Sequence, residues 1–181
     1  AVKPREKPDP IAVDSAFLRS VPLFARIPSS SPWLLAFSRR IQRVHFRKGQ
    51  TIYTQGQHPT HLYLVQDGEV HILRRDADTA QAGLLAIQTR GSIFGEVSFL
   101  SGELHSSSAS AALDSHVLLV PGEAFLRLMG REPSVGEALS RLLSERLRNR
   151  IGHLASEPPA HVFTLTDPQN PARGAGIARL L

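Results

Sequence analysis

Short apolar segments recur along residues 40–120, and Gly, Asp or Ser residues separate them. Alternating apolar and polar positions within such segments are typical of strands with one buried face. Strands of this length and spacing favour a sandwich or barrel. Seven strands are predicted, at Arg40–Phe46, Thr51–Thr54, His61–Gln66, Glu69–Arg74, Gly83–Thr89, Ser107–Leu113 and His116–Val120.

Turn residues divide these strands at defined places. Asp67-Gly68 predicts a tight hairpin, because Gly adopts positive φ without steric strain. The polar stretch Asp76–Gln81 predicts an exposed hairpin tip.

Helices are predicted on both sides of the barrel. Ser31-Pro32 pairs an N-cap residue with a first-turn proline and opens a helix through about Phe37. Trp33 and Phe37 lie one helical turn apart and are predicted to be core residues. Beyond the barrel, Pro121–Met129 reads as a helix that breaks near Gly130.

A longer helix is predicted from Pro133-Ser134, where Ser134 and Glu137 have the spacing of a capping box. Its first half is expected to pack on the barrel. For the second half, packing on the barrel and packing on a partner helix remain equally open. The helix carries one apolar stripe, made of Val135, Leu139, Leu142, Leu143, Leu147, Ile151 and Leu154.

The stretch 91–109, GSIFGEVSFLSGELHSSSA, holds the most specific motif of the chain. Its Phe-Gly-Glu turn and the small residues that follow resemble the phosphate-binding cassette of cyclic-nucleotide-binding domains. Such domains occur in catabolite activators and in regulatory subunits of protein kinase A. The resemblance extends over about residues 14 to 154 and includes Phe46, Gly49, Gly56, Leu62, Tyr63 and Gly68. It implies a mainly β fold, an eight-stranded jelly-roll β-barrel with flanking α-helices.

The resemblance also implies a ligand, cAMP or cGMP, with no other cofactor. Gly95 lets backbone approach the ligand closely, and successive N–H groups at a turn favour phosphate oxygens. The matching family residue of Glu96 binds a ribose hydroxyl, and Ser106 and Ser107 carry hydroxyls that can donate to phosphate. The candidate ligand-binding residues are Phe94, Gly95, Glu96, Val97, His105, Ser106 and Ser107.

One position departs from the family pattern, because His105 stands where the family has Arg. Neutral His offers one donor and no charge, whereas Arg binds phosphate bidentately. Binding is therefore predicted to be weaker at about pH 8 than at about pH 6. Two functions remain open: a nucleotide sensor that controls an attached effector, or a scaffold or dimerisation module that binds no nucleotide.

Composition and charge limit the classes of partner and the cellular location expected for this chain. The chain has 181 residues, a formal net charge of +5 and no cysteine, which excludes disulfides and fits a reducing, cytoplasmic location. No apolar run approaches the roughly 20 residues that span a bilayer, although a longer parent protein could still be membrane-associated. The arginine residues that contribute to this charge are interpreted as a surface that contacts solvent or a partner protein. Residues 156–181 are too short and too rich in proline for a helix-turn-helix DNA reader.

Three parts of the chain are distinguished: a flexible segment over 1–13, the binding domain over 14–155 and a linker or the start of another domain over 156–181. The first residue is Ala, and the last residues continue an apolar pattern, so the chain is expected to be part of a larger protein. The tail, with HVFTLT at His161–Thr166, resembles the segment that joins such domains to patatin-like hydrolases of the neuropathy-target-esterase type. A homodimer through the long helix is a further expected contact.

Catalysis is not predicted in this chain. It lacks the Gly-x-Ser-x-Gly turn of serine hydrolases. His58 and His61 lie three residues apart with no carboxylate beside them, which is read as an accidental surface pair rather than a metal site.

Overall fold

The structure is a computed structural model that describes residues 13–75 and 82–155. Three predicted features lie outside the described residues: the flexible segment over 1–13 (apart from Val13), the hairpin tip Asp76–Gln81 and the tail segment His161–Thr166. The strands are β1 (Gln42–Phe46), β2 (Thr51–Tyr53), β3 (His61–Asp67), β4 (Glu69–Arg75), β5 (Ala82–Thr89), β6 (Ile93–Phe94), β7 (Ser108–Ala111) and β8 (Ser115–Pro121). The helices are α1 (Ser15–Ser20), α2 (Pro32–Ser38), α3 (Glu96–Ser101), α4 (Gly122–Arg131) and α5 (Pro133–Ala155).

The eight strands form two antiparallel four-stranded sheets, ordered β1-β8-β3-β6 and β2-β7-β4-β5. Alternate side chains of both sheets meet in one core, because successive residues of a strand point to opposite faces. The predicted eight-stranded jelly-roll fold is confirmed. The core residues are Val44, Phe46, Ile52, Tyr53, Tyr63, Val65, Val70, Ile72, Phe94, Ala109, Ala111 and Val117.

The seven predicted strands are present, with ends that differ by one or two residues. The sequence pattern missed β6 and the short helix α3, which both lie in the cassette. A two-residue strand shows no alternation, and a six-residue helix shows less than two turns of periodicity.

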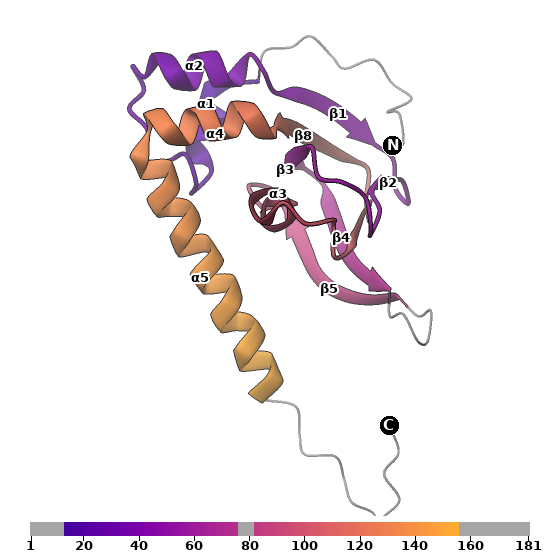
Figure 1. Cartoon of the computed structure of the whole chain (residues 1–181). Helices are drawn as coiled ribbons and strands as arrows, with labels where there is room; N and C mark the ends of the chain where they lie inside the picture. Colours follow the sequence, from indigo (N-terminus) through magenta and orange to yellow (C-terminus); the bar gives the residue numbers. More distant parts are fainter. Residues whose placement is uncertain (1–12, 76–81, 156–181) are drawn as a thin grey trace, which may run out of the picture. The chain divides into compact units, whose positions relative to one another are not determined.

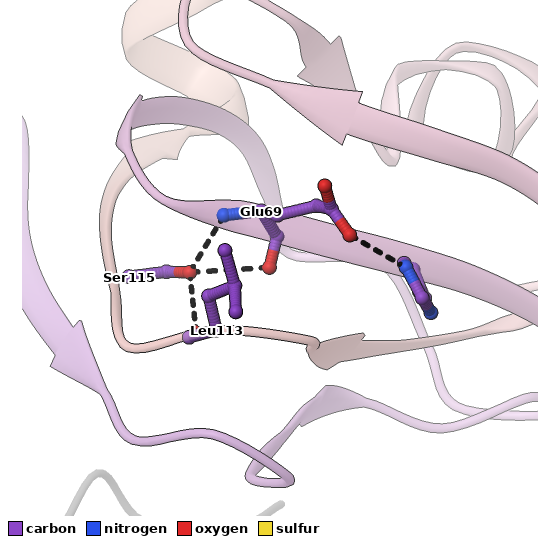
Figure 2. A network of polar contacts seen from close by, with 4 residues as sticks. Glu69, Leu113 and Ser115 are labelled. Atoms are coloured by element: carbon purple, nitrogen blue, oxygen red, sulfur yellow. Dashed lines mark hydrogen bonds and ion pairs between the residues drawn. The ribbon is translucent and has the colours of Figure 1, made fainter.

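The predicted hairpin at Asp67-Gly68 is confirmed, with φ +91° at Gly68. Figure 2 shows how the buried hydroxyl of Ser115 ties this hairpin to the turn before β8. The hydroxyl accepts a hydrogen bond from the Glu69 N–H at 3.0 Å and lies within donating distance of the carbonyls of Leu113 (2.7 Å) and Glu69 (3.1 Å). One buried side chain therefore contacts three backbone polar groups of the two turns.

The helices α1, α2 and α4 lie together beside the barrel (Figure 1). The predicted cap of α2 is confirmed, because the Ser31 hydroxyl accepts from the Leu34 N–H at 3.4 Å and Pro32 occupies the first turn. The helix α4 ends at Arg131, one residue beyond the predicted break near Gly130, and α5 begins at Pro133 as predicted. The predicted capping box is wrong, because Ser134 lies inside α5 and not at its N-cap.

The stripe on α5 divides in its exposure. Val135 and Leu139 are buried, whereas Leu147 is 61% exposed. The chain also divides into two compact units between Leu142 and Leu143. The first half of the stripe is thus buried at Val135 and Leu139, while its packing on the barrel and the contacts of the second half stay predictions.

Candidate functional site

The cassette begins where β6 ends, at a backbone turn that only glycine fits. Gly95 has φ +77° and precedes the first residue of α3. A Cβ at this position would lie 2.8 Å from Cδ2 of Tyr63, which is closer than real Cβ contacts. The turn thus requires both the positive φ and the missing side chain of glycine.

Glu96 is the first residue of α3, and its side chain is only 1% exposed. A carboxylate near a helix start interacts favourably with the backbone N–H groups there. Burying such a group away from water is unfavourable unless polar partners surround it. The cassette therefore holds a hydrogen-bond acceptor inside the domain, at the position that the sequence predicted for sugar recognition.

Four aromatic rings pack together across the barrel interior. The His105 ring stacks on Tyr53, with centroids 3.9 Å apart and planes 13° from parallel. Phe94 stacks on Tyr63 at 5.2 Å, and the two tyrosines lie 5.2 Å from each other. The cluster links both ends of the cassette, since Phe94 precedes α3 and His105 follows it.

Burial shifts the pKa of two of these rings. It lowers the pKa of His105 below 6.5 and raises the pKa of Tyr63 to about 12. His105 is 3% exposed, so its imidazole is a neutral, stacked side chain near pH 7. The residue at the family's Arg position thus contributes packing to the free domain rather than charge.

The second end of the cassette is tied to the loop between β2 and β3. The His105 N–H donates to the carbonyl of Gln57 at 2.9 Å, and its carbonyl accepts from the Gly56 N–H at 2.8 Å. Ser107 is buried beside it, whereas Ser106 is exposed. Val97, on the first turn of α3, also faces solvent. Of the seven predicted residues, Val97 and Ser106 are therefore the two at the surface.

Sequence reasoning missed Tyr53, Tyr63, Phe99 and Gly122 as parts of the site. The chain has two tyrosines, and both lie in the aromatic cluster. The small number of tyrosines was the feature of the sequence that could have drawn attention to them. The Phe99 ring of α3 covers Gly122 so closely that a Cβ there would lie 2.7 Å from Cδ2 and closer still to the ring end. The cassette helix is thus in direct contact with the start of α4.

Within 13–75 and 82–155, no three His, Cys, Asp or Glu side chains gather in a way that could hold a metal ion. None of the helices described there is long and apolar enough to cross a membrane.

Acidification is expected to lower the free energy of unfolding. Burial lowers the pKa of His105 and His61 below the 6.5 of an unfolded chain, so the unfolded state takes up protons first. Stability is fully present above pH 6.5, falls as pH drops through the window between 6.5 and the lowered folded pKa, and levels off below it. Urea unfolding at several pH values measures this loss.

A matched variant distinguishes the contribution of His105 to the pH dependence of stability from the contributions of other titrating groups. His105→Phe keeps an aromatic ring against Tyr53 but cannot titrate. Its stability should depend less on pH below 6.5 than that of the unmodified chain. Identical pH slopes for the two proteins would contradict the assignment.

Comparison with known proteins identifies the class of this domain. Residues 43–132 match the family model of the cyclic nucleotide-binding domain. The chain is 30% identical over 122 residues to the CRP-like cAMP-activated global transcriptional regulator of Mycobacterium tuberculosis, covering 67% of this chain and 54% of that protein. The domain belongs to the cyclic nucleotide-binding domain family, whose members are regulatory rather than catalytic, and the predicted resemblance is confirmed.

Solved structures agree with this assignment. The Thermus thermophilus catabolite activator protein superimposes with a TM-score of 0.66 at 33% identity, covering 74% of this chain and 62% of that one. Lysophospholipase NTE1 of Kluyveromyces lactis is 26% identical over 136 residues, which is 72% of this chain and 9% of that protein. A domain like this one therefore also occurs within a much longer lysophospholipase.

Proposed function

We propose that this domain binds cAMP or cGMP at the cassette and thereby controls an attached effector domain. The observation that carries the proposal is the buried carboxylate of Glu96 at the Gly95 turn, with Ser107 and His105 at the other end of the same cassette. Relatives named for cAMP, from Mycobacterium and Thermus, support the nucleotide class.

Each cassette residue has a role in this proposal. Glu96 accepts a hydrogen bond from a ribose hydroxyl, while backbone N–H groups and the hydroxyls of Ser106 and Ser107 donate to the cyclic phosphate. Gly95 keeps the turn open for backbone approach. Phe94 and Val97 flank the turn on its buried and exposed sides.

His105 contributes a proton-dependent interaction. A bound phosphate raises the pKa of an adjacent imidazole, so binding is coupled to proton uptake and affinity increases as pH falls. Because burial lowers the pKa of His105 in the free domain, the increase continues below pH 6.5. The pH dependence predicted between about pH 8 and about pH 6 is thus extended to lower pH.

Control of an effector needs a moving element whose two states bind the ligand differently. The contact of Phe99 with Gly122 connects the cassette helix to α4, which leads into α5 after Glu132. We propose this contact as the route by which ligand binding reaches the helices. Homodimerisation through α5, where Leu147 is exposed, remains part of the same proposal.

Titration calorimetry of the full chain with cAMP and with cGMP tests the binding. Glu96→Gln should weaken affinity roughly 10–100-fold, because it removes a charge-assisted hydrogen bond. Glu103→Gln is the matched control, since Glu103 is exposed on the same cassette and should leave affinity unchanged. His105→Arg should strengthen binding and remove its pH dependence.

Equal affinities for the unmodified chain and Glu96→Gln would contradict the proposed site. Hydrogen exchange with and without cAMP tests the coupling, and unchanged protection of α4 and α5 upon binding would contradict the route through Phe99.

The second candidate function, a scaffold without nucleotide, is favoured by the neutral His105 stacked on Tyr53. Absence of heat for both nucleotides, including with His105→Arg, would favour this second function.

A further inference from the structure

A groove between α2 and α4 lies outside the cassette and has no role in the proposed nucleotide site. It has a volume of about 400 Å³. A second hollow of about 390 Å³ adjoins it toward the start of α4, and Arg40, Ala124 and Arg127 line both. This second hollow, unlike the groove, is also lined by Phe99 and Gly122 of the coupling contact. These volumes are within the range of sites that hold a small ligand or a few side chains.

The groove has an apolar floor and a partly apolar rim. Phe37 and Leu128 are buried at its base, as core residues of the helix pair. Trp33 was predicted to be a core residue with Phe37, but its side chain is 44% exposed, so that prediction is wrong. Leu126 is also exposed along the groove. Trp33 and Leu126 thus present apolar area that the described part of the chain leaves exposed.

The groove is positively charged around this floor. The guanidinium of Arg131 lies over the Trp33 ring, 4.7 Å from its centroid. Arg127 pairs with Glu123 at 3.2 Å, and both are largely exposed, so the pair is weak. Within the described ranges, neither Arg40 nor Arg131 has a carboxylate within ion-pair distance. Two positive charges that line the groove, one of them over the indole, are therefore not neutralised by the residues that the structure describes.

We propose that this groove binds an acidic, apolar segment of a partner protein. An apolar side chain of the partner packs on Trp33 and Leu126, and a partner carboxylate binds the guanidinium of Arg40 or Arg131. Trp and Arg are the side chains that most often dominate the energetics of protein interfaces. A concave groove with a buried floor suits an inserted side chain better than it suits a flat lipid surface.

Trp33 makes the proposal directly measurable, because it is the single tryptophan of the chain. The probe is a synthetic amphipathic peptide of Leu, Phe and Glu, added to the full chain without nucleotide while tryptophan emission is recorded. We expect a saturable change in emission and at least tenfold weaker binding of a matched peptide with Lys in place of Glu. Because no nucleotide is present, the result is independent of the proposed cassette function.

Two charge-reversal variants locate the binding. Arg40→Glu should weaken the acidic peptide at least tenfold, whereas Arg39→Glu, the same charge change at an exposed neighbour that does not line the groove, should leave the affinity within about twofold. Arg131→Glu should act like Arg40→Glu. Circular dichroism of each variant checks that the fold is retained.

Several results would overturn the proposal. They are failure of the acidic peptides to change Trp33 emission, equal binding of the lysine peptide, and equal losses in Arg39→Glu and Arg40→Glu. Tighter binding to vesicles of anionic phospholipid than to the peptide would assign the groove to a membrane surface. Concentration-dependent self-association that Arg40→Glu abolishes would assign it to a second copy of the chain.

Discussion

Replacing Gly68 with alanine is expected to lower the free energy of unfolding by roughly 3–5 kcal/mol, combining backbone strain with overpacking. Gly68 has φ +91°, and a Cβ would lie 2.6 Å from the carbonyl oxygen of Asp114 and 2.7 Å from Cα of Ser115. Those atoms are backbone and cannot move without breaking the hydrogen bonds of Ser115 with Glu69 and Leu113 (Figure 2). Urea unfolding of the two proteins measures the difference.

Gly49→Ala is the matched control for the steric part of this effect. Gly49 has a similar φ, +82°, but no atom lies within 4 Å of its Cβ position. Its replacement should therefore cost only the strain of left-handed backbone, about 1–2 kcal/mol. If Gly49→Ala and Gly68→Ala destabilised the domain equally, the clash with Asp114 and Ser115 would have no energetic role.

Gly95→Ala is expected to reduce stability by roughly 2–4 kcal/mol and to disrupt the cassette. Its Cβ would lie 2.8 Å from Cδ2 of Tyr63, with φ at +77°. Relief requires either a shift of the Tyr63 ring, which stacks on Phe94, or a change at the first turn of α3. Under the proposed function, cyclic-nucleotide affinity should fall at least tenfold, because the backbone donors move.

Gly102→Ala is the control within the same cassette. Gly102 ends α3 with φ +73°, and nothing lies within 4 Å of its Cβ position. It should lose about 1–2 kcal/mol of stability from strain alone and keep its nucleotide affinity. Calorimetric titration and urea unfolding of both variants compare the two glycines. If Gly102→Ala lost as much nucleotide affinity as Gly95→Ala, the close approach of Gly95 to Tyr63 would not be what the site requires.

The amino-acid sequence by itself predicted seven of the eight strands and the main hairpin. Alternation of buried and less buried positions is a local property that the structure retains in strands such as β4 and β7, because one face of each sheet meets the same core. Asp67-Gly68 likewise predicted its turn from the conformational freedom of one glycine. The cassette residues were identified as a set because the segment between Phe94 and Ser107 resembles the family's motif.

Only the tertiary structure decided how those residues interact. Tyr53 of β2 lies far from His105 in sequence, and the pairing of β2 with β7 brings their rings into contact. That contact buries the imidazole and lowers the pKa of His105, which no local pattern could indicate. The exposure of Trp33 was decided in the same way, since helical spacing places a residue on a face but does not show how far the neighbouring helix extends over it. Burial depends on long-range packing, and long-range packing is what periodicity along a chain does not encode.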